Sequence, residues 1–95
     1  MTTVLIDHRV ADYDAWRPHF DRAMKADWTS PIRSYEVLRG QDDPNRVVVL
    51  QSFDSREAAE AFVNEPTLRE AMGSAGVDAS SVRVEYLDEV GSGTR

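Results

Sequence analysis

The residues in this chain best suited to acid or base chemistry are its two histidines, His8 and His19. Histidine titrates near neutral pH, so an imidazole can accept or donate a proton without a special environment. His8 alternates with Val4, Ile6 and Val10 in a strand-like pattern, which predicts that its ring points into the core. Two interpretations stay open for His8: a catalytic acid or base in a pocket, or a buried histidine satisfied by a backbone or tyrosine partner.

His19 falls at the border between the apolar stripe and the solvent side of its predicted helix, where a surface histidine is expected. The two histidines have no carboxylate or cysteine at ligand spacing, so we predict no metal site. Cysteine is absent, which excludes disulfides and thiolate catalysis. No glycine-rich phosphate loop or serine nucleophile motif is present either.

Other side chains are candidates to act beside His8. The hydroxyl of Tyr35 could donate a hydrogen bond to a substrate oxygen, which makes it the second candidate catalytic residue, or it could satisfy the core. The flat rings of Trp16 and Phe20 suit a planar ligand, although an aromatic stripe is also typical of a hydrophobic core. The remaining candidates for substrate binding are Arg33, Asn64, Met72 and Tyr86. The pattern leaves open which face of the strand containing Tyr35 meets the helices.

These residues are positioned by segments that read strand, helix, strand, strand, helix, strand. The strands are predicted at 3–10, 32–39, 46–53 and 81–88, and the first helix at 12–26. Asp12 is expected to cap the first helix, and Pro18 to bend or restart it near Trp16.

The second helix is expected to be capped by Asp54, with a buried side formed by Ala58, Ala61 and Phe62. Pro66 is predicted to begin a further short helix that ends at Gly76. Asn64, between these two helices, is alternatively a helix C-cap.

The order of the segments predicts an α+β, ferredoxin-like βαββαβ domain: a four-stranded antiparallel sheet with the helices on one face. The opposite face mixes apolar and charged side chains: Leu5, Asp7, Arg9, Arg83, Glu85 and Leu87. Such a face suits a sheet-on-sheet homodimer with internal ion pairs, and a monomer with an open sheet is the alternative. We expect one domain over 1–90 and a flexible tail over 91–95.

Charge and hydropathy limit the class of protein. The net charge is −6 and Lys25 is the only lysine, which argues against nucleic acid as a partner. No apolar run is long enough to span a bilayer, and no basic segment opens the chain, so no membrane association is expected. The sequence therefore predicts a soluble, cytoplasmic protein.

Three stretches together resemble the dimeric α/β-barrel superfamily, which includes antibiotic biosynthesis monooxygenases and small aromatic polyketide cyclases. They are the run 8–17, the hairpin 39–45 and the helical segment 68–72. The resemblance covers residues 3–90. It implies a homodimer whose two sheets form a barrel, a ligand cavity between helices and sheet in each monomer, and usually no metal, flavin or haem cofactor.

The resemblance makes a cofactor-independent enzyme acting on an aromatic or polyketide-like small molecule the expected function. In a cyclase, His8 would move protons during aldol closure and dehydration. In a monooxygenase, His8 would ionise a phenol whose anion reacts directly with oxygen. The alternatives are a non-catalytic homodimer that binds a small molecule, and a haem-degrading monooxygenase, for which His8 on a central strand is poorly placed.

Overall fold

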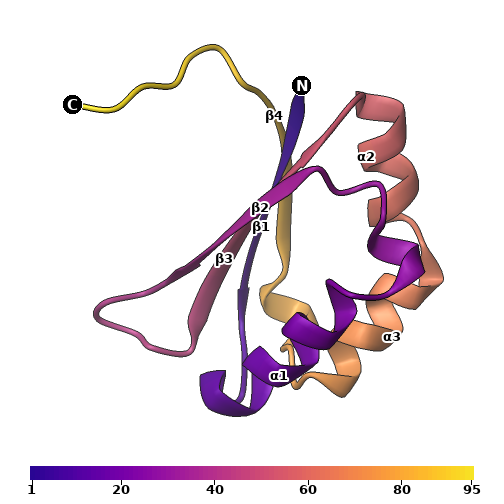
Figure 1. Cartoon of the computed structure of the whole chain (residues 1–95). Coiled ribbons are helices and arrows are strands. Elements are labelled where there is room, and N and C mark those ends of the chain that lie inside the picture. The colour runs from indigo at the N-terminus through magenta and orange to yellow at the C-terminus, as the bar shows by residue number, and fades with distance from the viewer.

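The computed structural model describes residues 1–95, and its centre is a four-stranded antiparallel sheet in the order β2-β3-β1-β4 (Figure 1). The strands are β1 Thr2–Arg9, β2 Ser34–Arg39, β3 Arg46–Phe53 and β4 Arg83–Asp88. Each predicted strand is found with its ends within two residues of the expected position. The predicted α+β, ferredoxin-like fold is confirmed, with β1 and β3 as the central pair.

Three α-helices pack on one face of this sheet, as Figure 1 shows. They are α1 Tyr13–Ala23, α2 Arg56–Val63 and α3 Pro66–Ser74, and short 3-10 turns occur at Asp27–Thr29 and Ala79–Ser81. None of the helices is long and apolar enough to cross a membrane.

The central strands divide their side chains between the two faces with a period of two residues. Val4 and Ile6 of β1, with Val47, Val49 and Phe53 of β3, are buried against the helices. Successive side chains on a strand point to opposite faces, so the residues between them form the outer face. The expected inner register of β1, which includes His8, is confirmed.

Helix α1 differs from its prediction in two respects. It runs unbroken through Pro18, and it ends at Ala23, short of the expected residue 26. Proline in the second turn removes one backbone donor, and the hydrogen bonds on either side of it keep the helix continuous. After Ala23 the backbone bonds tighten to a three-residue spacing, from Lys25 N to the Arg22 carbonyl and from Ala26 N to the Ala23 carbonyl.

Local hydrogen bonds and backbone conformation set the ends of helices α2 and α3. The predicted cap of α2 at Asp54 is wrong, because Ser55 accepts from Ala58 N at 3.1 Å instead. Pro66 begins α3 as predicted, and Gly76 follows it with a φ of +82°, a conformation that glycine adopts without strain.

The buried side of α2 also needs a correction. Ala59 and Phe62 are its buried residues, whereas Ala61, which was expected to face the core, is exposed. Ala59 and Phe62 are three residues apart and share the face toward the sheet, whereas Ala61 is turned by about 200° from Ala59.

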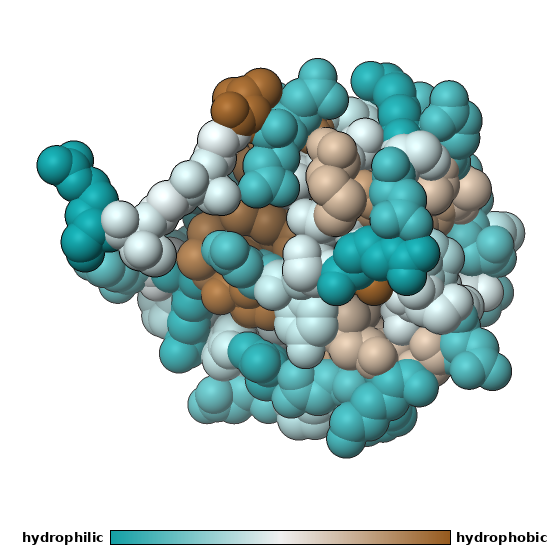
Figure 2. Space-filling view, turned by 45° about the horizontal axis from the view of Figure 1, so that its top comes forward, coloured by the Kyte–Doolittle hydropathy of each residue, from teal (hydrophilic) through white to brown (hydrophobic).

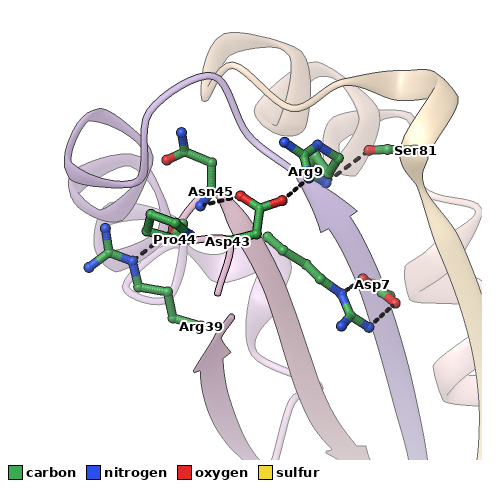
Figure 3. Close-up of polar contacts among 8 residues, drawn as sticks. Asp7, Arg9, Arg39, Asp43, Pro44, Asn45 and Ser81 are labelled. Atoms are coloured by element: carbon green, nitrogen blue, oxygen red, sulfur yellow. Dashed lines mark hydrogen bonds and ion pairs between the residues drawn. The ribbon is translucent and has the colours of Figure 1, made fainter. Parts of the chain in front are cut away.

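Ion pairs tie the outer face of the sheet to the β2–β3 hairpin (Figure 3). The guanidinium of Arg46 donates to the carboxylate of Asp7 at 2.8 Å and holds the pKa of Asp7 below its usual range. Arg9 pairs with Asp43 in the hairpin, while the Arg9 backbone N–H donates to Ser81 Oγ at 2.8 Å. The predicted mixture of charged and apolar groups is therefore present on this face.

Replacing Phe53 with alanine tests the inner core most simply. Its side chain is fully buried, so Phe53→Ala removes apolar contacts and leaves a cavity that should lower the free energy of unfolding by about 3–5 kcal/mol. Denaturant unfolding monitored by circular dichroism measures the change. Val90→Ala, at a side chain 96% exposed, is the control and should leave the stability within about 0.5 kcal/mol of the parent.

Candidate active site

The candidate active site is a cavity of about 60 Å³ between the inner face of the sheet and helices α1 and α3. Twelve of the 15 residues that line it are hydrophobic. The polar ones are His8, His19 and Gln51, so no carboxylate and no arginine borders this space. No group of three or more His, Asp or Glu side chains is placed to hold a metal ion.

His8 is buried in the wall of this cavity by its place in the inner register of β1. Its side chain is 3% exposed, and its Nδ1 has no hydrogen-bond partner. Burial lowers the pKa of the imidazole below 6.5, because an apolar site disfavours the charged form. The Ile6 carbonyl and the Asp7 carboxylate oppose this shift more weakly. His8 is therefore an uncharged base in an apolar environment at neutral pH.

Aromatic rings form one wall of the site. The Trp16 ring meets His8 edge-on, with ring centroids 5.9 Å apart, and stacks on Phe20 at 5.0 Å. Phe20 in turn meets Tyr35 edge-on at 5.5 Å. Trp16 and Phe20 project from α1 one turn apart, which is why the same helical stripe places both rings in the wall of the cavity. A planar, apolar group is the chemistry that such a wall accommodates.

Gln51 is a buried polar residue that the sequence pattern did not single out. It is 3% exposed, and its Oε1 has no hydrogen-bond partner. A buried acceptor without a partner costs free energy, so it is notable when it borders a cavity. The available signal was its register: Gln51 occupies an inner position of β3, between Val49 and Phe53, where the other side chains are apolar.

An outer cleft lies next to this cavity, beside helices α1 and α3. His19, Ala23, Trp28 and Ala71 line both the inner cavity and an outer cleft of about 270 Å³. The two alanines leave space between the helices because their side chains are short. His19 is half-buried at this junction, consistent with its expected position at the border of core and solvent.

The structure brings four of the predicted site residues together: His8, Trp16, Phe20 and Met72 all line the cavity. Tyr35 lies on the side of β2 that faces the helices, a point that the sequence pattern left open. Its ring packs on Phe20, but it is 46% exposed and does not border the cavity.

The other three predicted substrate-binding residues lie outside the cavity. Arg33 is held on the surface by a 2.6 Å ion pair with Asp54. Asn64 is the C-cap of α2, where its amide donates to the Glu60 carbonyl at 2.9 Å. Tyr86 lies on edge strand β4, its ring covered by the guanidinium of Arg56 at 4.6 Å. Local partners therefore explain all three positions.

The fold and its cavity define a small ferredoxin-like α+β protein with a small apolar cavity between the sheet and the helices. Residues 32–74 match the model of the antibiotic biosynthesis monooxygenase family. The resemblance to this superfamily inferred from the sequence is confirmed by that match and by the fold of the whole chain. No curated protein matches the chain in sequence.

Solved structures share this fold along nearly the whole chain. An antibiotic biosynthesis monooxygenase is 17% identical, with a TM-score of 0.71 over 96% of this chain and 100% of that one. Rv0793 from Mycobacterium tuberculosis is 20% identical, with a TM-score of 0.66 over 99% and 100% of the chains. A mutant of SnoaB, a cofactor-independent oxygenase from Streptomyces nogalater, is 12% identical, with a TM-score of 0.69 over 96% and 94%.

The lowered pKa of His8 predicts how stability depends on pH. The unfolded chain binds a proton at this imidazole more readily than the folded chain does. The free energy of unfolding is therefore unaffected by His8 protonation above about pH 6.5, and it decreases as the pH falls below this value. Thermal melts between about pH 7 and pH 5 should show this loss, and His8→Gln should flatten it. Asp7 and Asp54, whose pKa values are also lowered, lose their contribution only below 3.8. An equally steep melting profile for His8→Gln would contradict the assignment.

Proposed function

We propose that this protein is a cofactor-independent enzyme that oxygenates an aromatic or polyketide-like small molecule, with His8 as the base. The observation that carries the proposal is a buried imidazole without a partner at Nδ1, in a cavity walled by aromatic rings. The family match over residues 32–74 favours oxygenation over the cyclase chemistry that the same base could perform. The fold shared with SnoaB, a cofactor-independent oxygenase, supports the same choice.

In the proposed reaction, His8 accepts a proton from a phenol or from an activated CH2 group of the substrate. The resulting anion is electron-rich and reacts with molecular oxygen, which is the oxidant. One oxygen atom becomes a new carbonyl oxygen, and the other leaves as water with two hydrogens of the substrate. These are both hydrogens of the CH2 group, or the hydroxyl hydrogen and one ring hydrogen of the phenol, so no external reductant is required. The apolar walls exclude bulk water and strengthen the interaction of the anion with the protonated imidazole.

The size of the site restricts how a substrate sits. The inner cavity of about 60 Å³ is too small for a polycyclic molecule, since drug-sized ligands occupy pockets of about 300–1,000 Å³. We propose that the substrate lies in the outer cleft and extends only its reacting end between α1 and α3 toward His8. His19, at this junction, then contacts the middle of the molecule, and Gln51 offers its unpartnered amide oxygen to a substrate hydroxyl.

A homodimer through the outer face of the sheet is the proposed assembly. Leu38 and Leu87 are 49% and 42% exposed there, and the neighbouring Leu5, Val48 and Leu50 are only half-buried. Figure 2 shows apolar atoms gathered beside the C-terminal tail with hydrophilic side chains around them. A second copy of this face would cover the apolar atoms, and the ion pairs at its edge would set the register. Each protomer is then the domain 1–90, with 91–95 as its tail.

The non-catalytic alternative rests on one feature of the cavity. His8 has no carboxylate beside it in the lining, so the same pocket could bind a planar molecule without turning it over. A haem-degrading enzyme is not supported, because a porphyrin exceeds the inner cavity and His8 is too deeply buried to reach an iron in the outer cleft.

Replacing His8 with glutamine tests the proposed base. With a panel of polycyclic phenols as substrates, His8→Gln should lower kcat by about 10²–10⁴-fold, the usual contribution of a general base, while binding changes little. Oxygen consumption and product mass report the reaction. Glu57→Gln, an exposed change on α2, is the control and should keep full activity. Unchanged turnover by His8→Gln would overturn the role of His8, and binding without turnover in the parent protein would favour the non-catalytic alternative.

Light scattering on a sizing column tests the proposed dimer. The expected mass is twice the 10.7 kDa of one chain. Leu50→Arg places a charge in the centre of the outer face and should shift the protein to monomer, because an unpaired charge is costly to bury. Ala61→Arg, on the exposed side of α2, adds the same charge elsewhere and should leave the dimer intact. A parent protein that elutes as a monomer at micromolar concentration would contradict the proposed interface.

A further inference from the structure

A second cavity lies on the other side of α3, between that helix, the end of α2 and the inner face of β4. Its volume is about 390 Å³, and eight of its ten lining residues are hydrophobic, among them Val63, Val77, Val82 and Val84. This volume falls within the range of about 300–1,000 Å³ that small-molecule sites occupy. The cavity is therefore large enough to enclose the apolar part of a ligand.

Arg69 is the only charged residue that lines this cavity. It projects from α3, and its side chain takes part in no ion pair or hydrogen bond, whereas the arginines at 9, 17, 33, 46, 56 and 83 all pair with carboxylates. A guanidinium matches the two oxygens of a carboxylate with paired hydrogen bonds. An unpaired arginine at the rim of an apolar cavity thus supplies what an amphipathic anion requires.

We propose that this cavity binds a monocarboxylate with an apolar body, the hydrocarbon lying among the valines and the carboxylate on Arg69. The single cation at the rim and the net charge of −6 favour a ligand with one negative charge over a dianion such as a phosphate monoester. The site is separate from the cavity of His8: the two share only Ile6, Leu68 and Met72 as a common wall. Binding here does not depend on the proposed oxygenation.

Decanoate and decanol, titrated by calorimetry below the concentration at which decanoate forms micelles, separate the two parts of the site. The parent protein should bind decanoate more tightly than decanol. Arg69→Gln should weaken decanoate binding about tenfold and leave decanol binding unchanged, because only the carboxylate uses the guanidinium. Lys25→Gln removes the same charge from an exposed position outside the cavity and should change neither affinity. Equal binding of decanoate by the parent protein and Arg69→Gln would overturn the role of Arg69.

Gly73 allows the apolar part of the site to be tested as well. A Cβ added at Gly73 meets no atom within 4 Å, so Gly73→Ala should fold and bind as the parent does. Gly73→Leu extends a side chain over the cavity and should abolish binding of both ligands, with circular dichroism confirming the fold. Undiminished binding of decanoate by a folded Gly73→Leu protein would place the ligand elsewhere. His8→Gln should leave the affinity for decanoate unchanged, so failure of this proposal and failure of the oxygenase proposal give different results.

Discussion

The inner faces of β1 and β3 are the constraint on which the rest of this structure depends. The two strands pair antiparallel along their whole length, from Thr2 opposite Phe53 to Arg9 opposite Arg46. A shift of one residue in this register would turn every buried side chain to the outer face, so the burial of Val4, Ile6 and Phe53 fixes the pairing. The same register decides the direction in which His8 points.

The inner face carries polar groups that a purely structural core would not need. His8 Nδ1 and Gln51 Oε1 are both buried without a partner, and each would be easier to accommodate as an apolar side chain of similar size. The protein accepts this cost at the two positions that border its aromatic cavity. Unsatisfied polar atoms cluster at functional sites because a ligand can satisfy them, which is the physical link here between packing and chemistry.

The fold could be predicted from the sequence because the strand and helix signals agree with one another. Alternation in 3–10, the run 47–50 that is apolar on both faces, the turn at 40–45 and the breaks at Pro66 and Gly76 all belong to one arrangement. Errors arose where tertiary contacts compete with a local signal. Asp54 resembles a helix cap, but Arg33 holds its carboxylate and Ser55 caps the helix instead.

Only part of the candidate site could be predicted from the sequence. His8, Trp16 and Phe20 follow from periodicity, since one strand register and one helical stripe place them in the core. Gln51 was missed because the run 47–50 is apolar on both faces, so the sequence alone did not show which register of this strand faces the core. Tyr86 was expected beside the ligand because it shares the inner register, but position along the edge strand, which periodicity does not report, places it under Arg56.

His8 is buried behind the sheet, where its imidazole is expected to be uncharged at neutral pH. Nuclear magnetic resonance of the imidazole C–H signals against pH measures its titration directly, with His8→Gln identifying which of the two histidines gives each signal. We expect the His8 signal to titrate with a midpoint below 6.5, because burial lowers the pKa of this imidazole from that value. A midpoint at or above 6.5 would mean that the imidazole is solvated or paired, and would rule out an uncharged, buried His8.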